Sequence, residues 1–457
     1  MSTFNRVLKA FGAGLYGRLG TIVIQIAGVP LFISLWGEQV YGEWLIMSSV
    51  PAYLSMSNLG YGVVASNEMS MEVANNHRHK ASAIFQSIWW ATLFFSAFLV
   101  GIAILVIHWL PVTEFLNIAK LPVFKANQVI TLLLLHTVVA LPYALLVGVY
   151  RSEGNYARGV FLNSTIRIIE LLLVLLVAIF GYGVVEAACC YLLVRLLGMA
   201  ITMIDLKNRY EWFSLSINAF HWSIVKRLFS PSLYFMFFPL GNTFIIQGMT
   251  TLTGIMLGAT QVVVLNTVRM VINFSKNINN LINNSVLPEL SLHISQKDYS
   301  KARLLHTTCC QLNTGLSLII GITLMLGGVW IIQFWTNGEV EVESSFLYAF
   351  VLVSIVNTFW NSSLYVPLSV NQHMKISKIF MLGSLVSLFC AWAFITQLGL
   401  LSIPLAILLV DVFMSFFVLK ISLSVLSQSL TEFRNQVFSM TSWLNLFRKL
   451  QAQLKGV

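Results

Sequence analysis

The sequence predicts an all-α polytopic membrane protein, and three observations carry this prediction. Charged residues make up 10% of the 457 positions, whereas a soluble domain carries roughly 25%. Apolar residues make up 57%, and the mean hydropathy is +0.81. Long apolar blocks such as residues 171–180 occur, which transmembrane barrels lack because their strands alternate apolar and polar residues. These features exclude a soluble enzyme, a disordered chain and a disulfide-rich secreted scaffold.

Apolar windows long enough for one helical crossing predict twelve spans. The first six cover residues 12–35, 41–65, 84–109, 128–150, 159–180 and 183–205. The second six cover residues 229–256, 261–287, 304–335, 346–370, 376–397 and 400–428. We expect two pseudo-symmetric six-helix lobes, a 6+6 parallel repeat. The expected domains are an N-terminal lobe at 1–206, a cytoplasmic connection at 207–228, a C-terminal lobe at 229–428 and a cytoplasmic amphipathic helix at 429–457.

The distribution of basic residues predicts that both termini are cytoplasmic. With that orientation only Lys120 and Lys125 fall in outer loops, and nearly all other loop cations lie on the inner side. Lys and Arg concentrate in cytoplasmic loops of membrane proteins, so the formal net charge of +10 does not indicate nucleic-acid binding. Arg18 interrupts the first apolar stretch and no cleavage site follows, so we expect the first span to be retained.

The C-terminal segment 431–455 is predicted to be an interfacial helix. Apolar residues such as Phe433 and Val437 recur every three or four positions, and basic residues such as Arg448 and Lys449 stand between them. This pattern is typical of a helix that lies on an anionic membrane surface.

A shift of 221 positions aligns the opening of each half without gaps. The identical pairs are Gly20 with Gly241, Gly37 with Gly258, Asn58 with Asn279, Glu68 with Glu289, and Ser70 with Ser291. Each half would then begin with a hairpin of two long helices that turns at a glycine. Two lobes of the same orientation are related by an axis along the membrane normal, and substrate is expected between them.

Several charges lie inside predicted spans, where each cation costs roughly 2.5–3.5 kcal/mol. Arg167 and Glu170 share a helix face, which predicts an ion pair between them. Arg195 has no acid nearby in sequence, so both a structural role and a pore role stay open. Lys420 is close enough to the cytoplasmic end to reach water. Asp411 and Glu170 are candidates for ion coupling, although Asp411 could instead pair with an internal arginine.

The eighth span carries a continuous polar stripe. Its members, at three- and four-residue steps, are Asn266, Arg269, Asn273, Lys276, Asn277, Asn280, Asn283 and Asn284. Shorter polar stripes occur in three other spans, with Arg18 and Gln25 in the first, Ser55 and Asn58 in the second and Gln247 in the seventh. Such faces must meet water or polar protein groups. A hydrated central cavity and polar packing between helices are both consistent with them.

The sign of the charge in the expected cavity indicates an anionic substrate. Arg18, Arg269 and Lys276 would give it positive charge, which suits a diphosphate. The cavity-lining residues expected to bind sugar hydroxyls are Gln25, Ser55, Asn58, Gln247, Asn266, Asn273, Asn277 and Asn280. An oligosaccharide head group cannot cross hydrocarbon unaided, because each uncompensated hydroxyl costs roughly 4–8 kcal/mol.

Two sequence features resemble the polysaccharide branch of the multidrug/oligosaccharidyl-lipid/polysaccharide exporter superfamily. One is the polar eighth span that runs into the sequence VLPELS at 286–291, and the other is SNLGYG at 57–62 together with the turn at 37–42. The resemblance implies a two-lobed flippase of the bacterial inner membrane for undecaprenyl-diphosphate-linked oligosaccharide, such as an O-antigen repeat unit. A polysaccharide polymerase and a chain-length regulator are then candidate partners, beside membrane lipids. Relatives often have Asp where Asn58 stands, which places any coupling through that Asp in doubt.

Two rival functions remain open at this stage. A cation-coupled drug antiporter on the same scaffold would need carboxylates in the cavity. A membrane glycosyltransferase or polymerase would usually place acidic residues in large outer loops, whereas the loop at 110–127 holds only Glu114. No nucleophile–base pair, phosphate-binding loop or metal-ligand spacing occurs, so we expect no enzyme activity, no cofactor and no metal.

Overall fold

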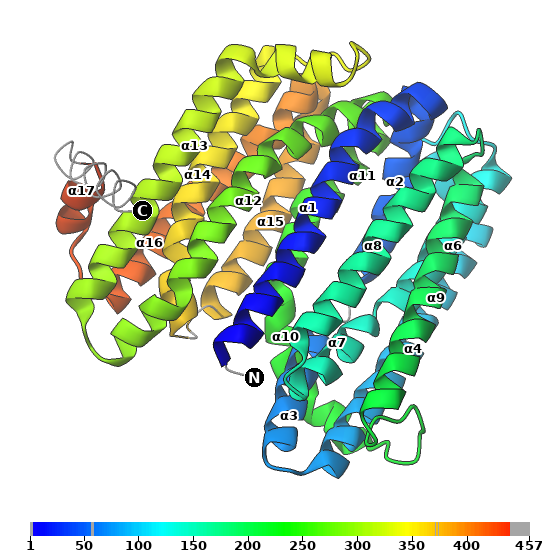
Figure 1. Ribbon diagram of the computed structural model, residues 1–457. Coiled ribbons are helices and arrows are strands. Elements are labelled where there is room, and N and C mark those ends of the chain that lie inside the picture. The colour runs from blue at the N-terminus through cyan, green and yellow to red at the C-terminus, as the bar shows by residue number, and fades with distance from the viewer. Residues whose placement is uncertain (1–2, 56–58, 371, 373, 439–457) are drawn as a thin grey trace. The chain divides into compact units, whose positions relative to one another are not determined.

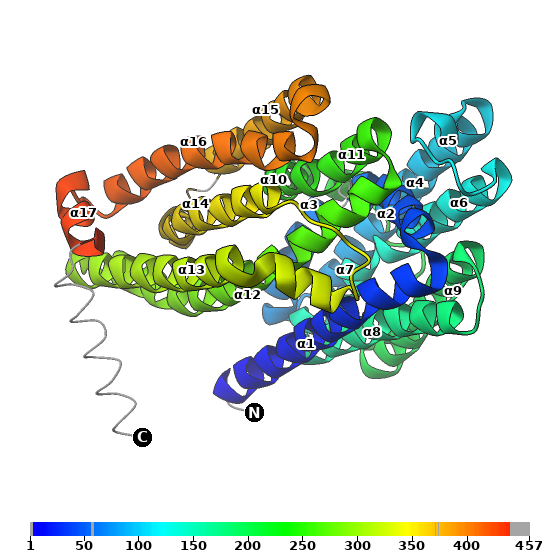
Figure 2. The same cartoon turned by 90° about the horizontal axis from the view of Figure 1, so that it is seen from above.

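The computed structural model describes residues 3–55, 59–370, 372 and 374–438, and every regular element among them is a helix. The chain forms two compact units, Met1–Val263 and Val264–Val457. Figures 1 and 2 show how the helices within each unit lie side by side. The all-α class predicted from composition is therefore confirmed.

The first unit contains eleven α-helices and a π-helical turn within the described residues. These are α1 (Thr3–Trp36), α2 (Glu38–Ser55), α3 (Leu59–Ala74), α4 (Arg78–Trp109), α5 (Val112–Phe115), α6 (Val123–Ala140), α7 (Tyr143–Ser152), α8 (Tyr156–Ile179), α9 (Val184–Arg209), α10 (Trp222–Thr243), the π-turn η2 (Phe244–Gly248) and α11 (Met249–Leu257). Helix α12 (Ala259–Ser295) begins here and continues into the second unit. The remaining elements are α13 (Tyr299–Trp335), α14 (Ser344–Ser369), α15 (Met374–Leu398), the short 3₁₀ turn η3 (Gly399–Leu401), α16 (Ser402–Val425) and α17 (Leu430–Phe438).

All twelve predicted spans coincide with helices, but not all are equally apolar. Eight segments of the described chain are long and apolar enough to cross a membrane, and one of these, Met374–Val425, holds both α15 and α16. A bent pair, Trp222–Leu233 with Phe235–Leu257, adds a further span if it is counted as one. The second predicted span is described in α2 and the start of α3, with residues 56–58 outside the described residues, and α12 is rich in polar residues. The second and eighth spans therefore have the most polar surface to satisfy within the protein.

The helix-hairpin turns at Gly37 and Gly258 have the same geometry in both halves of the sequence. Helix α1 ends at Trp36 and α11 at Leu257, and the next helix begins two residues later in each case. Gly37 has a φ of 81° and Gly258 a φ of 91°, a left-handed conformation that costs a residue with a Cβ atom about 1–2 kcal/mol. The 221-residue offset found in the sequence thus places equivalent turns at equivalent positions.

The seventh predicted span packs within the first unit. Helix α10 lies so close to α3 that a Cβ atom on Gly60 would collide with the backbone of Ser232. Gly254 of α11 is similarly close to Ile46 of α2. The compact division therefore falls at Val263–Val264, beyond the connection at 207–228. The predicted boundary between the two sequence repeats, at 207–228, is based on which spans correspond in the two halves, and it stays a prediction.

The C-terminal segment begins with a helix that packs on protein rather than on a membrane surface. In α17 the side chains of Phe433 and Val437 are 1% and 0% exposed. The Phe433 ring stacks on His306 of α13 at 5.1 Å, and Gln311 donates to the backbone of Gln436. For residues 430–438 the prediction of an interfacial helix is wrong, because the apolar side contacts α13. The rest of the predicted helix, from 439 onward, lies outside the described residues.

Candidate functional site

With Asn279 added at its buried edge, the polar stripe of α12 spans about 160° of the helix surface at 3.6 residues per turn. One edge of the stripe is exposed, the other edge is buried, and the two cations lie between them. This division separates residues that hold the second unit together from residues that are free to contact a ligand.

The buried edge of the stripe forms hydrogen bonds with α13 and α14. Asn279 donates to Ser317 at 2.9 Å and to Thr358 at 3.0 Å. Asn283 accepts from Asn313 at 2.7 Å. Asn279 and Asn283 are 4% and 1% exposed, so this part of the stripe is polar packing between helices.

The exposed edge carries the amide groups of Asn273, Asn277 and Asn280. Asn273 and Asn277 are exposed and Asn280 is half-buried. None of the three forms a side-chain hydrogen bond with another described residue. Asn266, which lies on the same side, is half-buried. Three amides at steps of four and three residues form one row along the helix that can donate to and accept from a solute.

Arg269 and Lys276 lie between the two edges and differ in their surroundings. Arg269 is buried, at 9% exposed. Lys276 is half-buried and interacts electrostatically with Asp411 of α16, although the two do not form a contact ion pair. Part of the positive charge of Lys276 is thus offset within the second unit.

Asp411 is held by neutral donors. It is 1% exposed and accepts hydrogen bonds from the amide of Asn357 at 3.1 Å and from the indole of Trp360 at 2.9 Å. The alternative that Asp411 pairs with an internal arginine is not found among the described residues. Sequence spacing could not identify Asn357 and Trp360, because they lie on α14.

Arg18 and Gln25 lie on one exposed side of α1. Helix α1 packs on α8 through Gly17 and Gly20, where a Cβ atom would collide with Ser164 and Ile168. Arg18 is about 100° from Gly17 around the helix and Gln25 about 80°, and both side chains are exposed. Gly17 and Gly20 therefore serve close packing, and the long polar side chains of Arg18 and Gln25 lie beside that contact.

The other predicted lining residues are described in part. Gln247 is half-buried in the π-turn η2 (Phe244–Gly248), and such turns within α-helices are frequent at functional sites. Ser55 is the last residue of α2, but its side chain lies outside the description. Asn58 lies outside the described residues.

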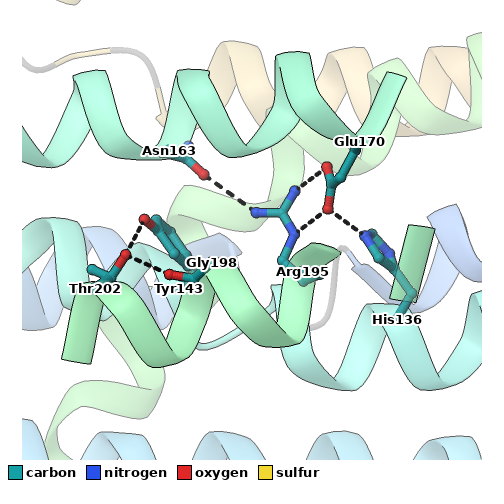
Figure 3. Close-up of polar contacts among 7 residues, drawn as sticks. All are labelled: His136, Tyr143, Asn163, Glu170, Arg195, Gly198 and Thr202. Carbon is teal, nitrogen blue, oxygen red and sulfur yellow. Dashed lines mark hydrogen bonds and ion pairs between the residues drawn. The ribbon is translucent and has the colours of Figure 1, made fainter. Parts of the chain in front are cut away.

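The first unit contains a buried ion pair between Glu170 and Arg195 (Figure 3), whereas the sequence analysis paired Glu170 with Arg167. Arg195 of α9 makes a bidentate ion pair with Glu170 of α8, with both N–O distances at 2.7 Å. Glu170 also contacts His136 at 3.1 Å, and Asn163 accepts from Arg195 at 3.4 Å. The predicted pair between Glu170 and Arg167 is wrong, and Arg167 is exposed.

The reason for that error is the geometry of neighbouring helices. Residues 167 and 170 share a face of α8, but Glu170 points toward α9, where the Arg195 guanidinium can satisfy both of its oxygens (Figure 3). Arg195 is 8% exposed and Glu170 1%, so each neutralises the other's buried charge. Arg195 therefore has a structural partner.

A buried carboxylate that the sequence analysis missed is Glu43 of α2. It is 0% exposed and accepts three consecutive backbone N–H groups, from Ala119 at 2.9 Å, Lys120 at 2.6 Å and Leu121 at 3.0 Å. Glu43 thereby fixes the segment between α5 and α6. The sequence did contain a signal for this residue, because Glu43 is the one acidic residue in the predicted span at 41–65.

Within the described residues no group of three or more His, Cys, Asp or Glu side chains could hold a metal ion. The cysteines at 189, 190, 309, 310 and 390 are free. The buried carboxylates Glu43, Glu170 and Asp411 all have hydrogen-bond or ion-pair partners.

Comparisons with known proteins identify the fold. No protein-family model matches the sequence, and no curated protein matches it. Among solved structures, the chain resembles an inward-facing multidrug resistance MATE family transporter of the MOP superfamily, with a TM-score of 0.71 at 13% identity over 89% of this chain and 98% of that one. An outward-facing structure described in the same words gives a TM-score of 0.62 at 14% identity, covering 92% and 95%.

A third similar structure differs in its described function. It is a MOP superfamily transporter from Pyrococcus furiosus, for which a reverse polarity of the binding pocket is said to suggest a different function. The TM-score is 0.62 at 14% identity, and the match covers 93% of this chain and 96% of that one. The twelve-span, two-lobed fold predicted from sequence is thus the fold of MATE-like transporters.

Proposed function

We propose that this chain is a multi-pass membrane transporter that flips an undecaprenyl-diphosphate-linked oligosaccharide, such as an O-antigen repeat unit, across a bacterial inner membrane by alternating access. The observation that carries this proposal is the exposed amide row of α12, Asn273, Asn277 and Asn280, beside Arg269 and Lys276. Amides bind sugar hydroxyls as both donor and acceptor, and guanidinium groups bind phosphate oxygens in pairs.

The placement of the carboxylates supports an anionic rather than a cationic solute. Glu170 is neutralised by Arg195, and Glu43 by three backbone N–H groups. Asp411 is buried and bonded to Asn357 and Trp360. The buried carboxylates Glu43, Glu170 and Asp411 thus already have partners, whereas the exposed row of the α12 stripe consists of neutral amides.

The proposed mechanism gives the residues distinct tasks. Arg18, Arg269 and Lys276 hold the diphosphate, while Gln25, Gln247 and the α12 amides exchange hydrogen bonds with the sugars. Because amide–hydroxyl bonds are individually weak and interchangeable, the head group can move along the row without a deep energy minimum. Membrane lipids, a polysaccharide polymerase and a chain-length regulator are the proposed partners.

The test is export of surface polysaccharide in a strain that lacks this gene. We expect Arg269→Gln and Arg18→Gln each to reduce O-antigen or capsule display at least tenfold, with protein level unchanged. Lys420→Gln is the matched control, since Lys420 is an exposed cation on α16, and it should leave display intact. Wild-type display with both arginine variants would remove these residues from the mechanism.

The comparisons favour a second candidate, a cation-coupled antiporter for drugs or other small molecules. Two of the similar structures are described as multidrug resistance transporters. In this case Asp411 or Glu170 would carry the coupling proton. A deletion strain should then become sensitive to cationic drugs, and Asp411→Asn should abolish rescue while polysaccharide display stays normal.

A further inference from the structure

The first unit has an apolar crevice that lies apart from the residues assigned to transport. It has a volume of about 380 Å³, and its walls come from α3, α4 and α10. The apolar side chains that line it include Tyr61, Phe95, Leu99, Trp222 and Phe229. A pocket of this size can enclose one apolar chain.

Lys226 is the one cation among the described residues of this mostly apolar lining, which also includes the hydroxyls of Thr92 and Ser96. Lys226 lines the crevice, is exposed, and forms no ion pair with a described residue. Trp222 and Phe229 on the same face of α10 are 46% and 51% exposed. A lysine beside partly exposed aromatic rings is the arrangement found where a helix meets the membrane interface.

The opposite face of the same helix segment lines a basic cavity of about 690 Å³. Its cationic and titratable lining residues are His79, Lys80, His221, Arg227 and Glu72. Arg227 pairs with Glu68, and Glu72 with His77, whereas Lys80 has no ion-pair partner among the described residues. Among the described residues, Lys80 on this side of α10 and Lys226 on the other thus leave unpaired positive charge at the start of the helix, which the loop charges assign to the cytoplasm.

The geometry points to a binding site for one anionic phospholipid of the cytoplasmic leaflet, with an acyl chain in the crevice and its phosphate on Lys226. The crevice is matched to hydrocarbon and Lys226 in its lining to a phosphate, so one molecule with both parts satisfies both. Binding would hold the start of α10 against α3 and α4. This site shares no residue with the proposed substrate row and does not depend on the proposed transport function.

The experiment is native mass spectrometry of the purified full-length protein loaded with phosphatidylglycerol or phosphatidylcholine. We expect one phosphatidylglycerol to be retained in preference to phosphatidylcholine. Lys226→Gln should reduce that preference about fivefold, the effect of one basic residue near an anionic surface. The matched control is Lys207→Gln, an exposed lysine at the end of α9, which should keep the preference.

A second pair of variants tests the crevice itself. Leu99→Trp narrows the crevice and should lower retention of both lipids, whereas Phe98→Trp, on an exposed position of the same helix, should not. Glycerol 3-phosphate, which lacks the chain, should fail to displace the lipid. Displacement by it would make this a phosphate site, tighter retention of undecaprenyl phosphate would reassign it to the substrate lipid, and equal retention by all variants would leave no lipid site.

Discussion

Asn277 and Asn279 stand two residues apart on α12 and have the same side chain, yet their surroundings differ completely. Asn279 is buried and bonded to Ser317 and Thr358, whereas Asn277 is exposed and has no side-chain partner among the described residues. A helix turns about 200° over two residues, which places the two amides on opposite sides. The polar residues of α12 thus form two surfaces on one helix, one that packs against α13 and α14 and one that is exposed.

We predict opposite effects of alanine at these two positions. Asn279→Ala removes the hydrogen bonds that this amide donates to the buried hydroxyls of Ser317 and Thr358, which should lower the free energy of unfolding by about 1–3 kcal/mol. Asn277→Ala should change it by less than about 0.5 kcal/mol and instead reduce polysaccharide export. Thermal unfolding in detergent and surface display would be measured for both; a stability loss in Asn277→Ala would show that this amide also has a packing role.

The ion pair of Glu170 and Arg195 provides a second prediction at the residue scale. Glu170→Gln leaves the arginine buried without its counter-charge and should cost about 3–5 kcal/mol. The double variant Glu170→Gln/Arg195→Met removes both charges and should regain most of that loss. Arg167→Met, at the exposed position, is the control and should be nearly neutral.

Transport by the same double variant distinguishes a purely structural role of the ion pair from a role of Glu170 in proton coupling. If the pair only stabilises the unit, the double variant should fold and transport. A double variant that is stable but inactive would instead assign Glu170 a role in proton coupling, which is the role that the drug-antiporter alternative requires.

At the scale of elements, the clearest feature is the repeated helix hairpin. The turns at Gly37 and Gly258 join α1 to α2 and α11 to α12 with nearly the same positive φ. Nothing lies within 4 Å of a Cβ atom built on Gly37, and on Gly258 the nearest atom, on Asn117, is at 4.0 Å. Backbone conformation rather than space therefore requires glycine at both turns.

Alanine at either turn should therefore destabilise the protein by a similar amount. We expect Gly37→Ala and Gly258→Ala each to cost about 1–2 kcal/mol, the strain of a left-handed residue with a Cβ atom. Gly101→Ala, in an open position within α4, should stabilise by about 0.5–1 kcal/mol through helix propensity. Melting temperatures of the three purified variants would check this, and equal values for all three would contradict the assignment of strain.

For the whole molecule, the unequal distribution of cations between loops predicts the orientation of the chain in the membrane, and this orientation can be tested. With both termini inside, only Lys120 and Lys125 lie in outer loops, and the acidic segment with Glu339, Glu341 and Glu343 is outside. The fold fixes the helices but not which side of a membrane they start from. That choice is made by the loop charges during insertion.

We predict that green fluorescent protein fused after Val457 will fluoresce, because the loop charges predict a cytoplasmic C-terminus. Alkaline phosphatase inserted after Glu341 should be active, because that loop would lie in the periplasm. A phosphatase inserted after Asn208, in the inner connection, is the matched negative control. Activity after Asn208 together with inactivity after Glu341 would reverse the topology.

The sequence by itself determined the fold class, the twelve helical segments and the offset between equivalent turns. These properties depend on composition, on apolar length and on the conformational freedom of single glycines, and each can be evaluated locally along the chain. The predicted helix boundaries failed where a turn interrupts a predicted span, as between α6 and α7 at Pro142.

Only the tertiary structure decided which polar groups are already satisfied. Glu170 bonds Arg195 rather than Arg167, Asn279 bonds α13 and α14 rather than facing outward, and Phe433 packs on α13 rather than on lipid. The physical reason is that a side chain's partner depends on the rotation and contact of neighbouring helices. Residues far apart in sequence set both, and spacing along one helix carries no information about them.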